Sequence, residues 1–408
     1  MKAERPYEQV HITAKGEAAL VGGHPWAYEG EVTGGGAAVD GELVDVLGPK
    51  GAYLGTGFYN SHSRIRVRLL SRNANDRFDE AFWRRRIQYA WSYRKTVMGP
   101  ADSRCCRVIF GEADQFPGLT VDRFESVLVA QVLSLGMERI KGLLFRLLAE
   151  VLREDGQEIV GVYERNDVAI RELEGMEQGK GWYPLPGEPV PACHSVDITE
   201  NGIVYTVDFV NGQKTGFFLD QKYNRQAVAR LAAGRTVLDC FTHTGSFALN
   251  AARGGAARVT AVDVSEYAVA CARENARRNG LDGVMDCLCA NVFDLLPRLV
   301  EQPRQYDFII LDPPAFTKSR KTTASAMTGY KEINYRAMKL LPRGGYLATC
   351  SCSHFATEEL FVKMLRSAAR DAGVQLRQIE ARQQSADHPI LWGVEETNYL
   401  KFFLFQVV

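Results

Sequence analysis

One segment, residues 236–252 (TVLDCFTHTGSFALNAA), limits the possible folds of this chain more than any other. A short run typical of a β-strand is followed by Asp239, by a compact polar loop that contains Gly245, and by an Ala-rich segment typical of a helix. A strand that enters a helix through a tight glycine-containing turn is the first crossover of a doubly wound α/β sheet. In such sheets a ligand binds beyond the carboxyl ends of the strands, where helix-start N–H groups face outward. The segment therefore favours a nucleotide-like ligand, although an ordinary strand-to-helix turn has a similar sequence.

Length and composition set the frame around this segment. The chain of 408 residues is longer than one average domain, so we expect two or three domains. Lys plus Arg and Asp plus Glu number 49 each, and no overall charge indicates a nucleic-acid partner. The nine cysteines include no C-x-x-C pair of zinc-ligand spacing, so no metal site is expected. Neither a transmembrane run nor a signal peptide is recognisable, which favours the cytoplasm and no membrane partner.

The sequence pattern divides the chain into three predicted domains. Residues 1–73 show short alternating runs between Gly-rich turns, which predict a small β domain. Residues 74–182 predict a small α+β unit, whose clearest helix is 137–154, with apolar residues at helical spacing. Residues 183–408 begin with a proline-rich stretch, after which strands and helices alternate. The predicted strands of this last part are 236–238, 258–262, 285–290, 308–311, 346–349, 376–381 and 399–405.

A basic segment interrupts the neutral chain. Residues 61–108 contain 12 Lys or Arg against 4 Asp or Glu, which indicates one basic face, although most such runs are simply solvated. Arg64, Arg66 and Arg68 alternate within a predicted strand, so their side chains share one side of it. Three aligned arginines are costly to bury and suit a phosphate backbone. We therefore predict RNA contacts by these three residues, and the helix that follows them, with Arg84 to Arg86, adds a basic patch.

Polar residues after the predicted C-terminal strands mark a candidate ligand site. Asp263 follows the second strand, where a carboxylate accepts hydrogen bonds from ribose hydroxyl groups, although it also suits a simple helix start. Asn291 follows the third strand and is placed to accept an adenine amino group. Asp312-Pro313-Pro314 follows the fourth strand, its prolines fix the backbone, and Phe316 comes next to stack on a flat ring. These residue types together suit a planar nucleobase.

Two cysteines, Cys350 and Cys352, follow the fifth predicted strand on the same rim. An isolated cysteine is usually a small buried apolar residue. A thiol at a strand end near helix-start N–H groups can nevertheless ionise near neutral pH, and the thiolate is a nucleophile. Because residues i and i+2 of a strand share a face, the pattern does not choose between the two cysteines.

These residues carry a resemblance to a known family. The segments DCFTHTGSF, VDVS, ANVFD, LDPPAF, GYKEIN and TCSCSHF resemble a class I S-adenosylmethionine methyltransferase. The chain is most similar to the RlmI-like family of 23S (large-subunit) ribosomal RNA cytosine-C5 methyltransferases. GHPWAYEGEV resembles the start of that family's N-terminal PUA domain, and VYERNDVAIRELEGM resembles its central domain. Two positions depart from the family pattern, since Ser246 stands where a second glycine is usual and Asn291 where an acid is usual.

The resemblance implies a Rossmann-like methyltransferase sheet at the C-terminus, after a PUA-like RNA-binding domain and a small central domain. It implies methyl transfer from S-adenosylmethionine to carbon 5 of a cytosine in large-subunit ribosomal RNA, through a covalent adduct. Cys352 is the implied nucleophile, and Asp312 is implied to hold the ring nitrogen and amino edge. Ribosomal RNA is the implied partner, and members of the family are often homodimers. The implied cofactor contacts are Gln221, Asp239, Phe241, Thr244, Gly245, Asp263, Asn291, Asp312 and Pro313, and Lys331 joins Arg64, Arg66 and Arg68 as a candidate RNA contact.

Two other functions stay open on the sequence alone. A methyltransferase that acts on an exocyclic amine of an RNA base also has an Asp-Pro-Pro-aromatic motif and needs no cysteine. A non-catalytic RNA-binding assembly factor would keep only a vestige of the methyl-donor site, which the intact Asp263, Asp312 and Cys352 argue against. Trapping of a covalent adduct on RNA that contains 5-fluorocytosine separates these functions, because only thiol addition predicts one.

Overall fold

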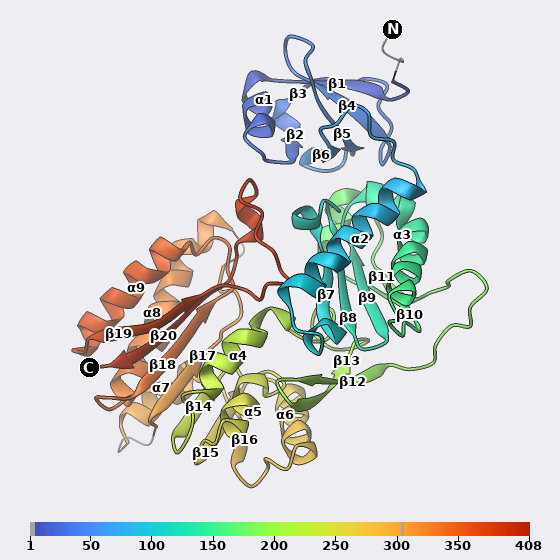
Figure 1. Cartoon of the computed structure of the whole chain (residues 1–408). Helices are drawn as coiled ribbons and strands as arrows, with labels where there is room; N and C mark the ends of the chain where they lie inside the picture. The colour runs from blue at the N-terminus through green and yellow to red at the C-terminus, as the bar shows by residue number, and fades with distance from the viewer. Residues whose placement is uncertain (1–4, 303–305, 318) are drawn as a thin grey trace. The chain divides into compact units, whose positions relative to one another are not determined.

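The computed structural model describes residues 5–302, 306–317 and 319–408, and these residues form four β-sheets and their helices (Figure 1). The chain divides into two compact units. None of the helices in the described residues is long and apolar enough to cross a lipid bilayer. The first unit comprises Met1–Ile198, Thr206–Leu219 and Ala386–Thr397, and the second comprises Thr199–Tyr205, Asp220–Ser385 and Asn398–Val408.

The first unit begins with a six-stranded sheet of strand order β2-β6-β5-β4-β1-β3. Its core is filled from alternating strand positions, such as Val44 and Val46, which are fully buried. Helix α1 begins where the hydroxyl of Thr13 accepts a hydrogen bond from the N–H of Gly16. The bounds are β1 (Glu8–Ile12), α1 (Ala14–Val21), β2 (Trp26–Tyr28), β3 (Val32–Gly34), β4 (Leu43–Leu47), β5 (Tyr53–Tyr59) and β6 (Ile65–Ser71).

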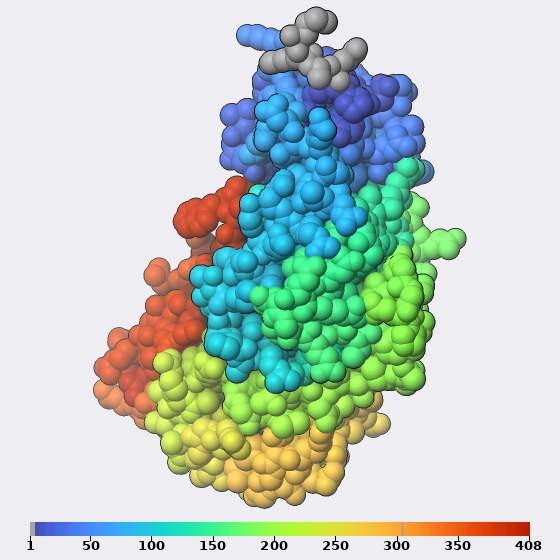
Figure 2. Space-filling view, turned by 45° about the vertical axis from the view of Figure 1, so that its right-hand side comes forward, coloured from blue at the N-terminus to red at the C-terminus, as the bar shows by residue number. Residues whose placement is uncertain are grey.

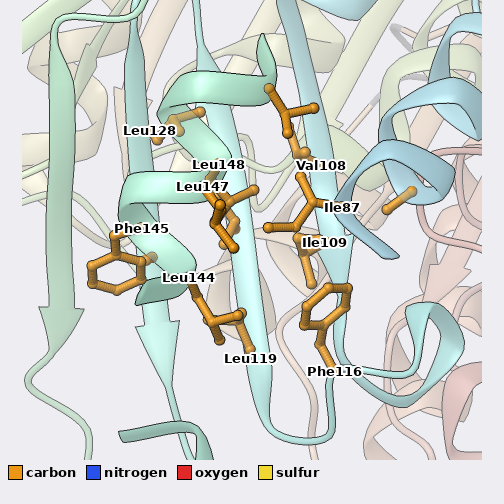
Figure 3. Packing of buried hydrophobic residues seen from close by; sticks show 14 of the residues in the cluster. Ile87, Val108, Ile109, Phe116, Leu119, Leu128, Leu144, Phe145, Leu147 and Leu148 are labelled. Carbon is orange, nitrogen blue, oxygen red and sulfur yellow. The ribbon is translucent and has the colours of Figure 1, made fainter. Parts of the chain in front are cut away.

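A five-stranded sheet of order β11-β10-β9-β8-β7 follows, and helices α2 and α3 pack against it. The apolar spacing that predicted a helix at 137–154 corresponds to α3, whose Leu144, Leu147 and Leu148 are completely buried. Figure 3 shows these leucines among side chains of the sheet. The bounds are α2 (Glu80–Val97), β7 (Cys105–Phe110), β8 (Leu119–Phe124), β9 (Val127–Val132), α3 (Leu135–Glu154), β10 (Gly161–Asn166) and β11 (Gly179–Tyr183), and a two-stranded sheet of β12 (Ser195–Glu200) and β13 (Ile203–Asp208) comes next.

The seven-stranded sheet of the second unit has the order β16-β15-β14-β17-β18-β20-β19, in agreement with the seven predicted strands. All neighbours are parallel except β20, which is antiparallel to β18 and to β19. Since β14 pairs with β15 on one side and with β17 on the other, the strand order reverses at β14, where sheets of this type bind their ligands. The bounds are α4 (Lys222–Ala229), β14 (Thr236–Cys240), α5 (Ser246–Arg253), β15 (Arg258–Asp263), α6 (Glu266–Arg278), β16 (Met285–Cys289), α7 (Val292–Val300), β17 (Phe308–Leu311), α8 (Thr323–Leu340), β18 (Tyr346–Ser351), α9 (Glu358–Ala372), β19 (Leu376–Arg382) and β20 (Lys401–Val407).

Two strand ends lie two residues beyond the predicted ones. Asp239 is inside β14, because the strand still pairs with both neighbours at Asp239 and Cys240. Cys350 and Ser351 are inside β18, because they pair with Phe402 and Lys401 of β20. Two polar residues, Asp239 and Ser351, fall outside the predicted strands. Pairing with distant strands places both of them inside the sheet. The domain boundaries at residues 73 and 182 stay a prediction.

Candidate cofactor and catalytic site

The loop between β14 and α5 is built from left-handed backbone positions. Phe241, His243 and Gly245 have φ angles of 64°, 52° and 86°. A Cβ atom on Gly245 would lie 3.0 Å from atoms of Ala272 and Met285, so the loop requires glycine there. Left-handed residues other than glycine store strain, and such strain concentrates at ligand sites. Nothing in the sequence pattern revealed the strain at Phe241 and His243.

Asp239 lies fully buried beneath this loop. Its Oδ2 accepts hydrogen bonds from the hydroxyl of Thr242 (2.5 Å) and the N–H of Ala248 (2.9 Å). Among the described residues, neither its Oδ1 nor the hydroxyl oxygen of Thr244 has a hydrogen-bond partner, although both atoms are buried. Burial raises the pKa of Asp239 to about 7, and the Thr242 hydrogen bond opposes this rise. Because buried polar atoms are normally paired, these two oxygens indicate the place of a polar ligand.

Asp263 ends β15 and is half-buried. Its Oδ2 accepts the N–H of His243 (2.9 Å) and its Oδ1 accepts the N–H of Ser265 (3.0 Å). A carboxylate offers about four acceptor sites, so two hydroxyl groups of a ribose can still donate to it. Asn291 is exposed, and its amide oxygen accepts the N–H of Phe293 (3.0 Å) at the start of α7. This helix cap was not predicted, and the adenine contact of Asn291 stays a prediction.

Asp312 follows β17 and belongs to a polar cluster. The amide nitrogen of Gln221 donates to its Oδ1 at 3.0 Å, and the Cys350 thiol is a further hydrogen-bond partner. Burial raises the pKa of Asp312 to about 7, with a further rise from Asp220, while Arg225 lowers it. A carboxyl with this pKa is protonated in a large fraction of molecules at neutral pH, so it can both donate and accept a proton.

The structure separates the two cysteines that the sequence pattern left equivalent. Cys350 is completely buried, and burial, followed by the charge of Asp312, raises the pKa of its thiol well above the usual range. Cys352 lies just beyond β18 and is partly exposed. Its Sγ is 3.9 Å from the carbonyl oxygen of Pro313, the residue after Asp312. Of this pair, only Cys352 presents a thiol at the surface of the site.

Aromatic rings surround Phe316 at this rim. The ring of Tyr330 lies 4.6 Å from that of Phe316, and those of Phe293 and Phe241 lie 5.7 Å and 6.4 Å away. Burial raises the pKa of Tyr330 to about 12, and its hydroxyl accepts a hydrogen bond from Ser351. Tyr330 was not among the predicted site residues, although GYKEIN contains it. The next residue, Lys331, forms an ion pair with Asp371 at 2.5 Å and is partly exposed.

The predicted RNA-binding arginines lie in the first unit and differ in their surroundings. Arg64 is exposed, whereas Arg66 pairs with Glu29 at 3.0 Å. Arg68 is 11% exposed and pairs with Glu112 (3.4 Å) and Glu174 (2.9 Å). The three arginines therefore do not share one environment, because acids distant in the sequence neutralise Arg68. RNA contacts by Arg64, Arg66, Arg68 and Lys331 stay a prediction.

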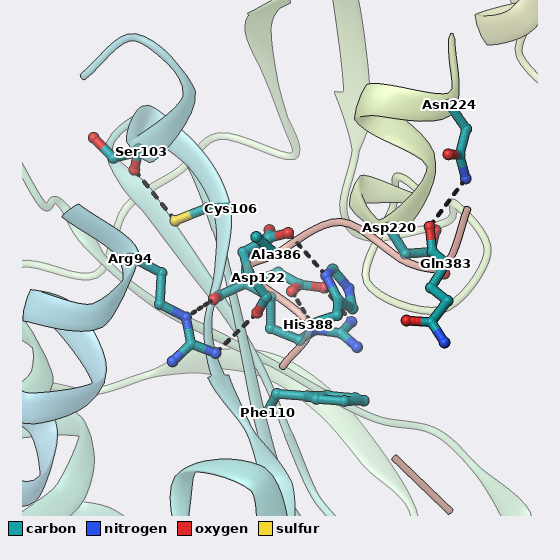
Figure 4. Close-up of polar contacts among 12 residues, drawn as sticks. Arg94, Ser103, Cys106, Phe110, Asp122, Asp220, Asn224, Gln383, Ala386 and His388 are labelled. Atoms are coloured by element: carbon teal, nitrogen blue, oxygen red, sulfur yellow. Dashed lines mark hydrogen bonds and ion pairs between the residues drawn. The ribbon is translucent and has the colours of Figure 1, made fainter. Parts of the chain in front are cut away.

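Much of the remaining basic segment is also paired within the first unit. Arg94 is fully buried and forms an ion pair with Asp114 at 2.5 Å. It also donates to the backbone oxygen of Asp387, whose carboxylate accepts the N–H of Arg107 (2.8 Å). Figure 4 shows Arg94 and His388 in this cluster. On α2, by contrast, Arg85 and Tyr89 are exposed, and this helix forms part of the surface in Figure 2.

No group of three or more His, Cys, Asp or Glu side chains suited to a metal ion occurs in the part of the chain that the structure describes. The two unpartnered oxygens beside Gly245 instead fit an organic cofactor with hydrogen-bond donors.

Comparisons with known proteins identify the family of the chain. The family model described as S-adenosylmethionine-dependent methyltransferase matches residues 178–406, and that described as PUA-like domain matches residues 10–72. Ribosomal RNA large subunit methyltransferase I of Klebsiella pneumoniae (strain 342) is 39% identical over 400 residues, which cover 97% of this chain and 98% of the relative. The protein of the same name from Escherichia coli (strain SMS-3-5 / SECEC) is 38% identical over 97% of this chain and 99% of its own.

Solved structures show the same fold. A SAM-dependent methyltransferase from Streptococcus mutans has a TM-score of 0.81 at 22% identity and covers 98% of this chain and 100% of its own. The structure of methyltransferase SMU.776, complexed with SAH, has a TM-score of 0.83 at 22% identity and the same coverage. The expected Rossmann-like methyltransferase sheet, the PUA-like domain and the S-adenosylmethionine cofactor are therefore confirmed. The chain belongs to the S-adenosylmethionine-dependent methyltransferase family that includes the proteins named ribosomal RNA large subunit methyltransferase I.

Proposed function

We propose that this protein methylates carbon 5 of a cytosine in large-subunit ribosomal RNA, with Cys352 as the nucleophile. The observation that carries the proposal is the partly exposed thiol of Cys352, 3.9 Å from the carbonyl oxygen of Pro313, the residue that follows the buried Asp312. The relatives named ribosomal RNA large subunit methyltransferase I support the RNA substrate. A thiol at the rim of the site is needed for carbon-5 chemistry and has no part in amine methylation.

The cofactor contacts follow from the acceptors that surround the loop after β14. Asp263 would accept the ribose hydroxyl groups, and the open oxygens of Asp239 and Thr244 would accept other donors. Gly245 would let the backbone approach, and Phe241, Asn291, Pro313 and Gln221 would complete the walls. S-adenosylmethionine, when bound, supplies the methyl group that carbon 5 of the base takes up.

Carbon 5 of cytosine is a poor nucleophile until a thiolate adds to carbon 6. The Cys352 sulfur forms a bond to carbon 6, the electron pair of the 5,6 double bond moves into the ring, and Asp312 gives a proton to ring nitrogen 3. Carbon 5 of the resulting enamine would then take up the methyl group, with cleavage of the bond between the methyl carbon and the sulfonium sulfur and S-adenosylhomocysteine as the leaving group. A base then removes the carbon-5 proton, the carbon–sulfur bond breaks, Asp312 recovers the nitrogen proton and the thiolate leaves. The target base must be flipped out of any stack to reach the thiol.

The test uses RNA in which the target cytosine carries fluorine at carbon 5, which no base can remove as a proton. The full chain should form a covalent adduct with this RNA, detected by denaturing electrophoresis and mass spectrometry. Cys352→Ser should lose the adduct and methyl transfer while keeping its melting temperature and cofactor binding. Cys350→Ser is the matched control, because this neighbour is buried, and it should keep most of its activity.

The opposite pattern, with the adduct retained in Cys352→Ser and lost in Cys350→Ser, would give the nucleophile's role to Cys350. Full methyl transfer by both single variants and by the double variant would contradict thiol catalysis. The amine methyltransferase would then be the better assignment.

A further inference from the structure

Lys401 is a buried cation next to the candidate nucleophile. It begins β20 and pairs with Ser351 of β18, the residue before Cys352. Lys401 is 5% exposed to solvent. Its ammonium nitrogen donates to the backbone oxygens of Ser353 (2.6 Å) and Tyr399 (2.8 Å). The ammonium has three N–H groups, and no acceptor among the described residues is found for the third.

No ion pair with a carboxylate of the described residues neutralises the charge of this lysine. No acid within the described ranges forms an ion pair with Lys401, and the two carbonyl oxygens carry no net charge. A buried charge without a counter-charge is costly and is seldom kept for packing alone. Burial lowers the pKa of Lys401 to about 8, so the ammonium form still predominates at pH 7. The charged groups that act on it are, in order, Cys352 and the exposed Glu358 at the start of α9.

We propose that Lys401 is a positioning residue whose ammonium group is the fixed counter-charge of the Cys352 thiolate. The proposal rests on the proposed function, in which Cys352 is the nucleophile. A positive charge held beside a thiol favours the thiolate, which is the reactive form. The hydrogen bond to Ser353 anchors the segment that carries Cys352, so charge and nucleophile keep a constant separation. The base that takes the carbon-5 proton is a separate group, since the ammonium form has no free electron pair.

The test measures thiol ionisation directly in the full chain, without RNA. The protein is alkylated with iodoacetamide at a series of pH values, and the rate at each cysteine is read by mass spectrometry. Cys193, whose thiol is exposed, is the internal reference. In the parent protein the midpoint of Cys352 alkylation should lie at least about one pH unit below that of Cys193, which is a tenfold difference in thiolate fraction below both midpoints.

Lys401→Gln removes the charge but keeps an amide that can donate to the two carbonyl oxygens. Its Cys352 midpoint should rise to that of Cys193, with alkylation about tenfold slower at pH 7. Lys401→Met, which removes charge and donors, should give the same midpoint. Lys363→Met is the matched control, because it removes an exposed lysine of the same unit, and it should change nothing.

Equal midpoints for Cys352 and Cys193 in the parent protein would overturn the proposal without any variant. An unchanged Cys352 midpoint in folded Lys401→Gln would also overturn it and leave Lys401 as an anchor of the strand end only. Failure of the proposed function would look different. In that case Cys352→Ser would still methylate cytosine, whatever the alkylation experiment shows.

Discussion

The Asp239 carboxyl is buried, and burial disfavours its charged form. The free energy of unfolding therefore depends on pH. Burial raises the folded-state pKa to about 7, whereas an unfolded aspartate has a pKa of about 3.9. Between these values the folded chain binds a proton that the unfolded chain does not, so the free energy of unfolding falls as pH rises from about 4 to 7. The site therefore contributes most stability to the cofactor-free protein below pH 4.

Replacement of Asp239 by Asn should remove this loss of stability at higher pH. The variant should be more stable than the parent at pH 8, by about 1.4 kcal/mol for each unit of the pKa rise, and this advantage should vanish near pH 4. Urea unfolding of the cofactor-free proteins at both pH values measures the difference. Asp282→Asn, at an exposed position of the same unit, is the control. The same stability difference at pH 4 and pH 8 would contradict the assignment.

Single residues were predictable where local rules decide their role. The hydroxyl of Ser265 accepts the N–H of Ala268 at the start of α6, a role that serine commonly has immediately before a helix. The sequence also placed Asp263 and Asp312 at strand ends. Lys401 and Tyr330 could not be assigned in this way, because their roles depend on contacts with β18, which is distant in the sequence. Such contacts leave no periodic signal around the residues themselves.

At the level of elements, Arg68 in β6 and Arg64 just before this strand differ in their surroundings. Arg68 holds the acids Glu112 and Glu174, of which Glu174 is almost fully buried. Its removal leaves these carboxylates without a cationic partner, so Arg68→Ala should lower the free energy of unfolding by on the order of 3 kcal/mol. Arg64 is exposed just before β6, and Arg64→Ala should change stability by less than about 0.5 kcal/mol. Urea unfolding of both variants checks this contrast.

Arg64 also allows a test of RNA binding. Arg64→Ala should weaken binding of single-stranded RNA and reduce the slope of log affinity against log salt by about 0.7, the share of one phosphate contact. Filter binding at several salt concentrations measures the slope, with calorimetry of S-adenosylmethionine as the control that should not move. An unchanged salt slope in Arg64→Ala would mean that Arg64 is a solvated surface residue without a phosphate contact.

Elements were predictable in kind more readily than in extent. The apolar spacing of α3 and the seven alternating strands of the C-terminal sheet were visible in the sequence. The ends of β14 and β18 were not, because pairing with neighbouring strands continues past the apolar run. The net charge of residues 61–108 overstated how many of its cations are unpaired, for a related reason. Its partners, such as Asp114 for Arg94, lie in other elements.

At the level of the whole molecule, the two units do not correspond to two consecutive stretches of chain. The first unit takes in Ala386–Thr397, from the connection between β19 and β20. Within this unit the Asp387 carboxylate accepts the N–H of Arg107 in β7 at 2.8 Å. No local sequence pattern shows that this late segment packs with the early part of the chain, and the three predicted domains stay a prediction.

This arrangement predicts that residues 1–198 alone form an incomplete unit. In hydrogen exchange, the amide of Arg107 should exchange faster in this fragment than in the full chain, because its acceptor is missing. Amides of β4, such as that of Val46, should be equally protected in both, since β4 pairs only within the N-terminal sheet. Mass spectrometry of peptides from the two regions measures the contrast. Equal exchange of the β7 amides would mean that Asp387 adds nothing to the first unit.

The position of Ala386–Thr397 also matters while the protein is being made. The final residues, 386–408, contribute that segment to the first unit and then β20, which lies between β18 and β19, to the second. Neither unit can reach its full set of contacts until residues 386–408 have been synthesised. In many proteins the N-terminal domain folds completely before the next domain is synthesised. The first unit of this chain cannot, because it lacks residues 386–397 until late in synthesis. A chain that stops before residue 386 would therefore lack a part of each unit.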